Sequence, residues 1–463
     1  MELNGNKVVL VAVIMLACIA LSKRLRSASG ETHKRGVRLI DATRRSVVTG
    51  RSLVSRRRKV LPERITVAGV EIPALDETKH FKLIGTTGTG KSTAIREILE
   101  TAIARGDRAI LADPDGGYLA RFHNRFRGDI VLNPFEPDSV KWDLFSEIQN
   151  RYDVEQLASG LIANSQDPSA REWRGYARTF LAAVLRRCHD SGWRDTAELW
   201  RLLMVASPEE LRPMVADTPA QPFLETENAR MFGSIRSVTA PAIAALEYVQ
   251  SQRSAPFSVR GWVRDRTRSG LLFIPYKANQ LAALRSMIAA WMRLAIFEAL
   301  SQPEGFDQRL WFIIDELDAL GAIDGLKDAL ARLRKFGGRC VLGFQSLAQV
   351  SDTYGQGEAQ TIVENCSNTL ILRCSSSENG GTSQFASKLI GEREIVRRQV
   401  SRGTDRESAF AARGARRSRN VTEQHITESA VMPSELEQLP DMCGYLKRAS
   451  SAVWLKVAYG NRS

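Results

Sequence analysis

Short apolar runs separated by turn signals recur through most of the chain. Eight of them predict buried strands, at residues 81–84, 109–112, 130–132, 271–274, 310–314, 341–344, 369–372 and 454–457. Residues 64–72 alternate around Ala68-Gly69, which predicts a hairpin leading into the first of these strands. Helical periodicity follows two strands, in residues 92–101 and 326–336. This succession of strands and helices predicts an α/β domain.

The pattern changes between about Asp138 and Gln252, where strand signals almost disappear and a helical period dominates. One face of residues 171–188 carries Trp173, Tyr176, Ala177, Phe180, Leu181, Val184, Leu185 and Cys188. A stripe of this width is typical of a helix face in a protein core. The sequence therefore predicts an all-α domain, residues 138–252, inserted into an α/β domain formed by residues 61–137 and 253–463.

The amino-terminal residues 8–21 are continuously apolar. As a helix they span about 21 Å, short of the roughly 30 Å hydrocarbon core, so a short anchor and a cleavable signal peptide compete. Basic residues follow the run, with Lys23, Arg24 and Arg26, whereas Lys7 before it is offset by Glu2. The positive-inside rule then favours an uncleaved single-pass transmembrane helix, residues 1–22, with the body in the cytoplasm.

The net charge of +13 is not evenly spread along the chain. Residues 23–59 hold thirteen Lys and Arg against two acids, which predicts a basic juxtamembrane segment, residues 23–60, facing lipid head groups or nucleic acid, or else a solvated linker. Residues 393–419 hold nine arginines among many Ser, Gly and Ala. Their composition predicts a mobile loop, either a plain surface loop or one that touches phosphates in a pore.

Residues 85–92, GTTGTGKS, fit the phosphate-binding pattern G-x-x-x-x-G-K-[ST]. Glycines allow the backbone N–H groups to turn inward, and the start of the following helix adds partial positive charge. We expect Lys91 to reach the β- and γ-phosphates of ATP and the Ser92 hydroxyl to bind Mg²⁺. The nucleotide-binding set is Gly85, Thr86, Thr87, Gly88, Thr89, Gly90, Lys91, Ser92 and Thr93.

Two later strands end in polar residues that suit nucleotide hydrolysis. The run 310–314 ends in Asp315 and Glu316, predicted to hold Mg²⁺ and to polarise the attacking water, respectively. The run 340–344 ends in Gln345, whose amide is placed to sense the γ-phosphate. With Lys91, these residues make a candidate catalytic set.

Three arginines, Arg332, Arg334 and Arg339, cluster at the end of the predicted helix 326–336. Such a cluster is typical of an arginine finger that enters a neighbouring subunit's site, and equally of cations that complement a helix dipole.

The order of several motifs resembles the type IV secretion coupling proteins, the TraD/TrwB-like conjugation ATPases. They are GTTGTGKST, DPDGGY, VLNPFEPDSVKWDLFSEI, MFGSIRSV, FSVRGWV, WFIIDELDAL, LGFQSLAQV and VMPSELEQLPDMCGYLK, from about residue 35 to the carboxyl end. The resemblance implies a RecA-like P-loop NTPase domain interrupted by an all-α domain. It also implies a homo-hexamer at the bacterial inner membrane that uses ATP to move single-stranded DNA, with double-stranded DNA as the alternative.

The same resemblance implies relaxase or relaxosome proteins and the secretion channel as partners, and it carries the catalytic role of the arginine cluster to Arg334. One feature departs from the family: members usually have two transmembrane helices, and this sequence shows one short apolar run. Two alternative functions remain, a DNA translocase of the FtsK/HerA kind and a membrane docking protein that recruits relaxase or effector proteins.

Overall fold

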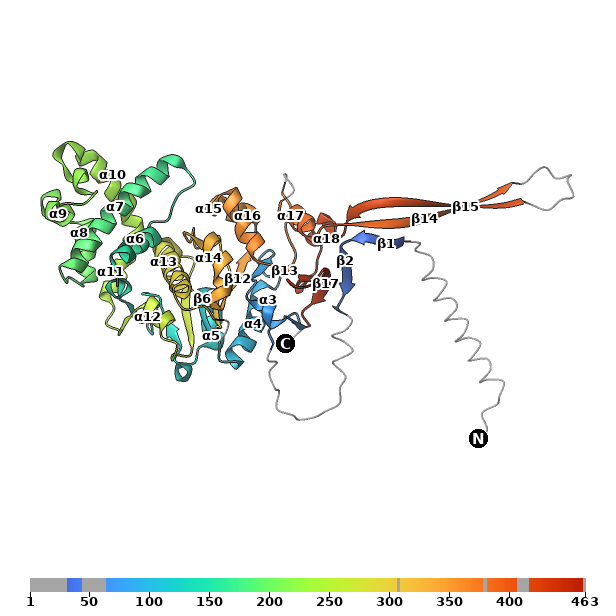
Figure 1. The fold of residues 1–463 in the computed structure, drawn as a ribbon, viewed down its shortest axis with the longest axis horizontal. Coiled ribbons are helices and arrows are strands. Elements are labelled where there is room, and N and C mark those ends of the chain that lie inside the picture. Colours follow the sequence, from blue (N-terminus) through green and yellow to red (C-terminus); the bar gives the residue numbers. More distant parts are fainter. Residues whose placement is uncertain (1–30, 44–63, 306–308, 378–380, 406–415, 461–463) are drawn as a thin grey trace, which may run out of the picture. The chain divides into compact units, whose positions relative to one another are not determined.

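The computed structural model describes residues 31–43, 64–305, 309–377, 381–405 and 416–460 of the 463 (Figure 1). The chain divides into two compact units. The first comprises residues 1–39 and 387–432, and the second comprises residues 40–386 and 433–463. The predicted anchor and most of the basic juxtamembrane segment lie outside the described residues. Within the described part of the chain, no helix combines the length and hydropathy needed to cross a bilayer.

A ten-stranded sheet forms the centre of the second unit, in the order β2-β17-β16-β13-β5-β12-β11-β6-β10-β7. The strands are β2 (Arg38–Asp41), β5 (Phe81–Ile84), β6 (Arg108–Pro114), β7 (Ile130–Val131), β10 (Leu271–Tyr276), β11 (Leu310–Ile314), β12 (Gly338–Phe344), β13 (Asn368–Ile371), β16 (Cys443–Lys447) and β17 (Val453–Ala458). From β13 to β7 neighbouring strands are parallel, and β16 and β17 add antiparallel pairs at one side. All eight strand predictions are confirmed, to within three residues at the ends.

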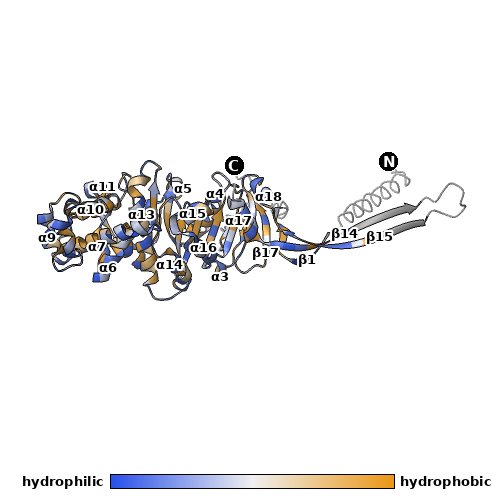
Figure 2. Ribbon diagram, turned by 90° about the horizontal axis from the view of Figure 1, so that it is seen from above, coloured by the Kyte–Doolittle hydropathy of each residue, from blue (hydrophilic) through white to orange (hydrophobic). Residues whose placement is uncertain are grey.

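Helices cover the parallel strands, which explains why β5, β10, β11 and β12 are buried along their whole length. The principal ones are α4 (Lys91–Ala104), α13 (Leu281–Leu300), α14 (Leu326–Leu333), α15 (Leu347–Tyr354) and α16 (Gln356–Asn365). Apolar residues run through the strands and the inward helix faces (Figure 2). The predicted hairpin in residues 64–72 is present as β3 (Thr66–Val67) and β4 (Val70–Glu71).

Helices also fill the interval between β8 (Lys141–Trp142) and β9 (Pro256–Phe257). They are α6 (Arg151–Leu161), α7 (Pro168–Asp190), α8 (Thr196–Met204), α9 (Pro208–Val215), α10 (Ala229–Ile243) and α11 (Leu246–Ser251), with short 3₁₀ turns. Side-chain caps start several of them, and the oxygens of Asp167, Asp195 and Ser207 accept backbone N–H groups at the starts of α7, α8 and α9. The fold is thus an α/β domain built on a largely parallel sheet and interrupted by an all-α domain.

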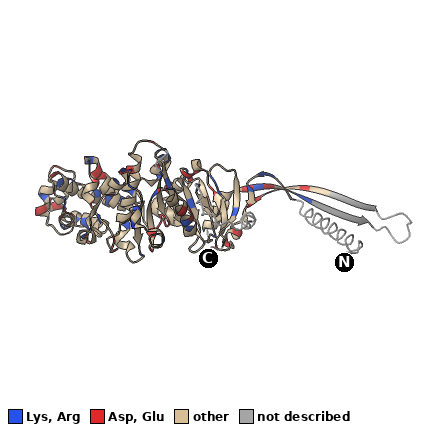
Figure 3. Cartoon of the chain, turned by 90° about the horizontal axis from the view of Figure 1, so that it is seen from below, with Lys and Arg blue, Asp and Glu red and all other residues tan. Residues whose placement is uncertain are grey.

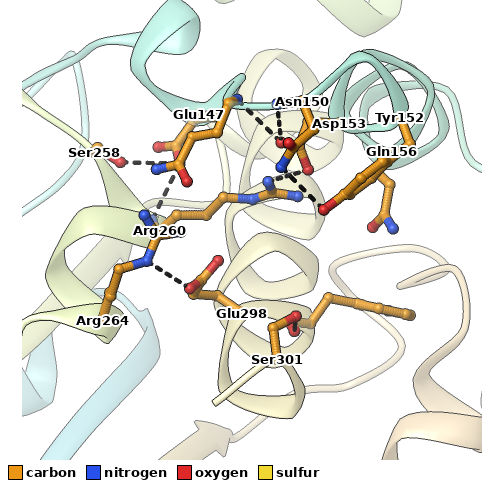
Figure 4. A network of polar contacts seen from close by, with 12 residues as sticks. Glu147, Asn150, Tyr152, Asp153, Gln156, Ser258, Arg260, Arg264, Glu298 and Ser301 are labelled. Atoms are coloured by element: carbon orange, nitrogen blue, oxygen red, sulfur yellow. Dashed lines mark hydrogen bonds and ion pairs between the residues drawn. The ribbon is translucent and has the colours of Figure 1, made fainter.

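A buried polar network joins the two chain crossings between these domains (Figure 4). Glu147, just after β8, accepts hydrogen bonds from the backbone N–H groups of Val259 and Arg260 at 2.7 and 3.1 Å. The Arg260 guanidinium forms an ion pair with Asp153 of α6. Because β8 and β9 also pair in parallel, the strands that lead into and out of the helical segment lie side by side.

The first unit contains a three-stranded antiparallel sheet, which the sequence did not predict. β14 (Glu392–Asp405) pairs with β15 (Arg416–Ser429) over fourteen residues, and β1 (Glu31–Gly36) pairs with β14. The prediction of a mobile loop for residues 393–419 is therefore wrong for residues 393–405 and 416–419. Charged residues lie along these strands (Figure 3). Two of the arginines that had suggested a loop form cross-strand ion pairs, Arg393 with Glu428 and Arg398 with Glu423.

Candidate nucleotide site

Residues 85–90 form a tight loop between β5 and α4. Gly88 and Gly90 have φ angles of 78° and 119°, in a region that side chains strongly disfavour. A Cβ on Gly85 would lie 2.9 Å from the Leu372 Cβ atom. The loop also closes on itself, because the Thr89 hydroxyl donates to the Thr86 carbonyl oxygen at 2.7 Å. These constraints give the phosphate-binding loop its predicted conformation at the start of a fourteen-residue helix.

Lys91, the first residue of α4, folds back over this loop. Its Nζ atom donates to the carbonyl oxygens of Gly85 and Thr86 at 2.6 and 3.2 Å. Burial lowers the pKa of Lys91, while Asp315 and Glu316 favour its charged form. A buried ammonium held only by carbonyl oxygens keeps one face for a stronger anionic partner. This arrangement suits a nucleotide phosphate.

Asp315 lies where β11 ends and receives two hydroxyl hydrogen bonds on the same oxygen. Ser92 and Tyr118 donate to its Oδ2 atom at 2.8 and 2.6 Å. Its Oδ1 atom is buried and has no hydrogen-bond partner among the described residues. An orphaned carboxylate oxygen beside a serine hydroxyl is the donor set that Mg²⁺ takes in phosphate-loop proteins. The residues present therefore fit the metal expected with ATP.

Glu316 is linked to the phosphate loop through Gln345. The Gln345 Nε2 atom donates to Glu316 at 3.2 Å, and the Thr87 hydroxyl donates to the Gln345 Oε1 atom at 3.0 Å. Burial, together with the charge of Asp315, raises the pKa of Glu316. A carboxylate with a raised pKa is better matched to take a proton from water near neutral pH. The hydrogen-bonded chain also connects the strand tips of β11 and β12 with the loop.

A cavity of about 230 Å³ lies against these groups. It is lined by Thr87, Gly88, Gly90, Lys91, Ser92, Thr93, Arg96, Asp315, Glu316 and Met442. The lining brings together eight residues that the sequence placed at the site, and it adds Arg96 and Met442. Of the other predicted residues, Gly85, Thr86 and Thr89 shape the loop from behind.

Arg334 is not among these groups. It lies exposed in the turn after α14, just before β12 begins, whereas the phosphate loop follows the end of a strand parallel to β12. The two therefore occupy opposite edges of the sheet within one chain. Arg339, another candidate of the arginine cluster, is buried and donates to Glu77 at 2.9 Å. Its interactions are structural, so it cannot reach a neighbouring subunit.

The motif DPDGGY supplies two groups whose roles the sequence analysis did not assign. Asp113, at the end of β6, accepts the backbone N–H groups of Tyr118 and Leu119 and thereby fixes the start of the helix α5 (Gly117–Phe122). This places the Tyr118 hydroxyl on Asp315. Burial raises the pKa of Asp113 to about 6.

Residues 64–459 match the family described as the type IV secretion-system coupling protein DNA-binding domain. The chain belongs to this coupling-protein family. It is 30% identical over 409 residues to the coupling protein TraD of Escherichia coli K12, an alignment that covers 86% of this chain and 55% of TraD. The chain thus spans about half the length of this curated relative.

Solved coupling-protein structures are similar over nearly the whole chain. Unbound TrwBΔN70, a bacterial conjugative coupling protein, has a TM-score of 0.79 and 31% identity, and the match covers 93% of this chain and 94% of that one. TrwB in complex with ADP and Mg²⁺ gives a TM-score of 0.78 at 31% identity, covering 93% and 95% of the two chains. These similarities confirm the RecA-like fold with an all-α domain in this coupling protein.

Proposed function

We propose that this protein is a membrane-anchored coupling ATPase that drives single-stranded DNA transfer in bacterial conjugation. The observation that carries the proposal is the convergence of Lys91 and Ser92 of α4 with Asp315 and Glu316 after β11 around one cavity, with Gln345 after β12 hydrogen-bonded to Glu316. The family match and the nucleotide complexes of TrwB support it.

Each residue of the site has a distinct role in this proposal. Lys91 binds the β- and γ-phosphates, and Ser92 and Asp315 hold Mg²⁺, which neutralises phosphate charge when bound. Glu316 takes a proton from the attacking water, and its raised pKa favours that transfer. Gln345 contacts both Glu316 and Thr87, so loss of the γ-phosphate would change its hydrogen bonds.

The proposed organisation follows the sequence. Residues 1–22 form a single-pass inner-membrane anchor, and residues 23–60 a basic juxtamembrane segment. Residues 61–137 and 253–463 form the nucleotide-binding domain, in the cytoplasm, and residues 138–252 the all-α domain. The subunits assemble as a homo-hexamer that receives relaxase-bound DNA and passes it to a type IV secretion channel. The helical interval between β8 and β9 supports this function over a translocase of the FtsK/HerA kind.

The test is ATP hydrolysis by the full chain with and without single-stranded DNA. We expect stimulation by DNA, and a fall on the order of 10²–10³-fold in rate for Lys91→Ala, because a charge-stabilising donor is lost. Lys456→Ala, an exposed lysine on β17, is the matched control. Absence of DNA stimulation, with transfer in cells unaffected by Lys91→Ala, would favour the docking protein instead.

In this proposal Arg334 completes the nucleotide site of a neighbouring subunit, because the nucleotide site of its own chain lies at the other edge of the sheet. Arg334→Ala and Lys91→Ala are expected to be inactive alone and partly active when mixed, because some interfaces then pair an intact Lys91 with an intact Arg334. Lack of any recovery in the mixture would remove Arg334 from the catalytic set.

A further inference from the structure

A second cavity, of about 520 Å³, lies at the edge of the sheet opposite the phosphate loop. It is formed by the segments that precede β6, β10 and β11. These three strands run in the same direction as β5 in the parallel part of the sheet, so their beginnings lie opposite the phosphate loop, which follows the end of β5. The lining contains five arginines and one acid. These are Arg105, Arg108, Arg266, Arg268, Arg309 and Asp107.

The inner part of this arginine pocket is electrically balanced. Arg105 forms ion pairs with Glu77 and Asp107, and Arg339 also binds Glu77. The indole N–H of Trp311 donates to Asp107 at 2.9 Å. Each buried carboxylate is therefore already paired with a buried arginine, so the outer arginines exceed the negative charge that remains.

The outer part carries an excess of positive charge. Arg309 lies 3.7 Å from Asp107, which Arg105 already binds, and its side chain is 45% exposed. Arg268 pairs with Asp265 at the surface. Pairs of this exposure contribute little stability, so both guanidinium groups can exchange partners at low cost.

Arg108 is held in place without a carboxylate. Its guanidinium donates to the carbonyl oxygens of Trp262 and Val263 and lies 4.0 Å from the centre of the Trp262 ring. Its Nε atom is buried and has no hydrogen-bond partner within the described residues. Burial lowers the pKa of Arg108 to about 10. A guanidinium that is oriented in advance and lacks a carboxylate is suited to an incoming oxyanion.

We propose that this arginine pocket binds a phosphate group, through Arg108, Arg268 and Arg309. Planar guanidinium groups that converge from separate loops match the oxygens of a phosphate. Two sources share this chemistry, a phosphodiester of single-stranded DNA and a free phosphate. The pocket is distinct from the nucleotide site because it lies at the other edge of the same sheet.

The test uses the full chain in mild detergent with saturating ADP and Mg²⁺, which occupy the nucleotide site. The variant is the double substitution Arg268→Ala/Arg309→Ala. Its control, Arg121→Ala/Arg151→Ala, also removes two exposed arginines that pair with acids, elsewhere on the second unit. Circular dichroism and the melting temperature without phosphate verify that each variant folds.

Two arms distinguish the sources. In the first, inorganic phosphate should raise the melting temperature of the wild type and of the control, but not of the pocket variant. In the second, binding of a fluorescent single-stranded oligonucleotide should weaken about tenfold at low salt in the pocket variant only. The magnitude of the slope of log K against log salt should also fall by about 0.7 for each lost phosphate contact, or about 1.4 for two.

A change in the phosphate arm alone identifies a free phosphate, and a change in both arms identifies the DNA backbone. Equal behaviour of the pocket and control variants in both arms would overturn the proposal and leave the arginines as a structural cluster. Arg108→Lys keeps the positive charge but removes the planar guanidinium group, so this variant should lose part of the phosphate binding. Because hydrolysis is not measured, the result does not depend on whether DNA stimulates the ATPase.

Discussion

The two edges of the parallel sheet differ in which charges are left without partners. At the edge with the phosphate loop, Asp315, Glu316 and Asp318 lie near Lys91, and the Oδ1 atom of Asp315 has no hydrogen-bond partner in the part of the chain that the structure describes. At the opposite edge, arginines pair with Glu77 and Asp107, and the arginines outnumber these two acids.

The difference teaches how one sheet keeps two regions of opposite charge apart. The carboxylates lie where parallel strands end and loops can bring Mg²⁺ and nucleotide together, as is usual for this fold class. The arginines lie where the strands begin. There the buried side chains of Arg105 and Arg339 stabilise the fold through ion pairs with buried carboxylates. The carboxylates therefore serve chemistry, and the buried arginines serve stability.

The largest effect that tests this comparison is expected for Glu316→Gln. Loss of the proton acceptor should lower kcat on the order of 10²–10³-fold. Nucleotide affinity should stay within about twofold, because the phosphate contacts of Lys91 are unchanged. Steady-state hydrolysis and ADP titrations separate the two quantities. An equal loss in nucleotide affinity would assign Glu316 to binding.

At the other edge, Arg339→Ala should act on stability. It leaves Glu77 buried with Arg105 as its remaining ion-pair partner, and the free energy of unfolding should fall by about 3 kcal/mol. Urea unfolding measures the change, and Arg332→Ala, an exposed arginine of α14, should stay within about 0.5 kcal/mol of the wild type. A stable Arg339→Ala variant with impaired hydrolysis would contradict the assigned structural role.

The same edge should contribute acid sensitivity through His80. This fully buried ring accepts the backbone N–H of Cys340 at Nδ1 and donates from Nε2 to the Leu330 carbonyl oxygen. Burial lowers its pKa to about 4, below the ordinary 6.5. The neutral ring thus stabilises the fold above about pH 6.5, and this contribution is lost as the pH falls toward 4.

The loss should approach about 3 kcal/mol. His80→Gln offers a donor and an acceptor that do not titrate, so its unfolding free energy should depend less on pH in this range. Urea unfolding at several pH values compares the two proteins. Parallel pH profiles would show that other groups cause the acid sensitivity.

The smallest effect is expected for Tyr118→Phe at the nucleotide edge. Losing the hydroxyl that orients Asp315 should raise the Mg²⁺ concentration for half-maximal hydrolysis about tenfold. Tyr152→Phe, which changes an exposed tyrosine of α6, is the control. An unchanged magnesium requirement would show that Ser92 alone orients the carboxylate.

The sequence predicted the parallel strands and most of the nucleotide site because both depend on local signals. An apolar run of four to six residues ending in Asp315, or glycines spaced around Lys91, is visible without the fold. The role of Tyr118 was not visible, since its contact with Asp315 joins residues 197 positions apart. The role of the arginine cluster was ambiguous for the same reason. Arg339 is buried against Glu77, and this contact joins residues 262 positions apart in the sequence.

The long ribbon of β14 and β15 was missed because its stabilisation is also non-local. Arg393 and Arg398 in isolation are typical of a solvated segment, and the acids that pair with them, Glu428 and Glu423, lie on the other strand, 35 and 25 positions away in the sequence. Charge composition therefore predicted the wrong secondary structure. Pairing of charges between distant segments was the missing information.

The packing of α13 limits how the all-α domain could be transplanted or removed. Because β8 and β9 lie side by side, the all-α domain looks as if it could be excised between them and replaced by a short linker. Yet Trp291 of α13 stacks edge-on against Trp142, and Arg293 donates to the Gln156 carbonyl oxygen of α6 at 2.8 Å. α13 follows the helical segment in the chain but is covered by it. A graft of the all-α domain into another scaffold must therefore include α13. If the domain is excised instead, the apolar residues of α13 that become exposed must be replaced by polar ones.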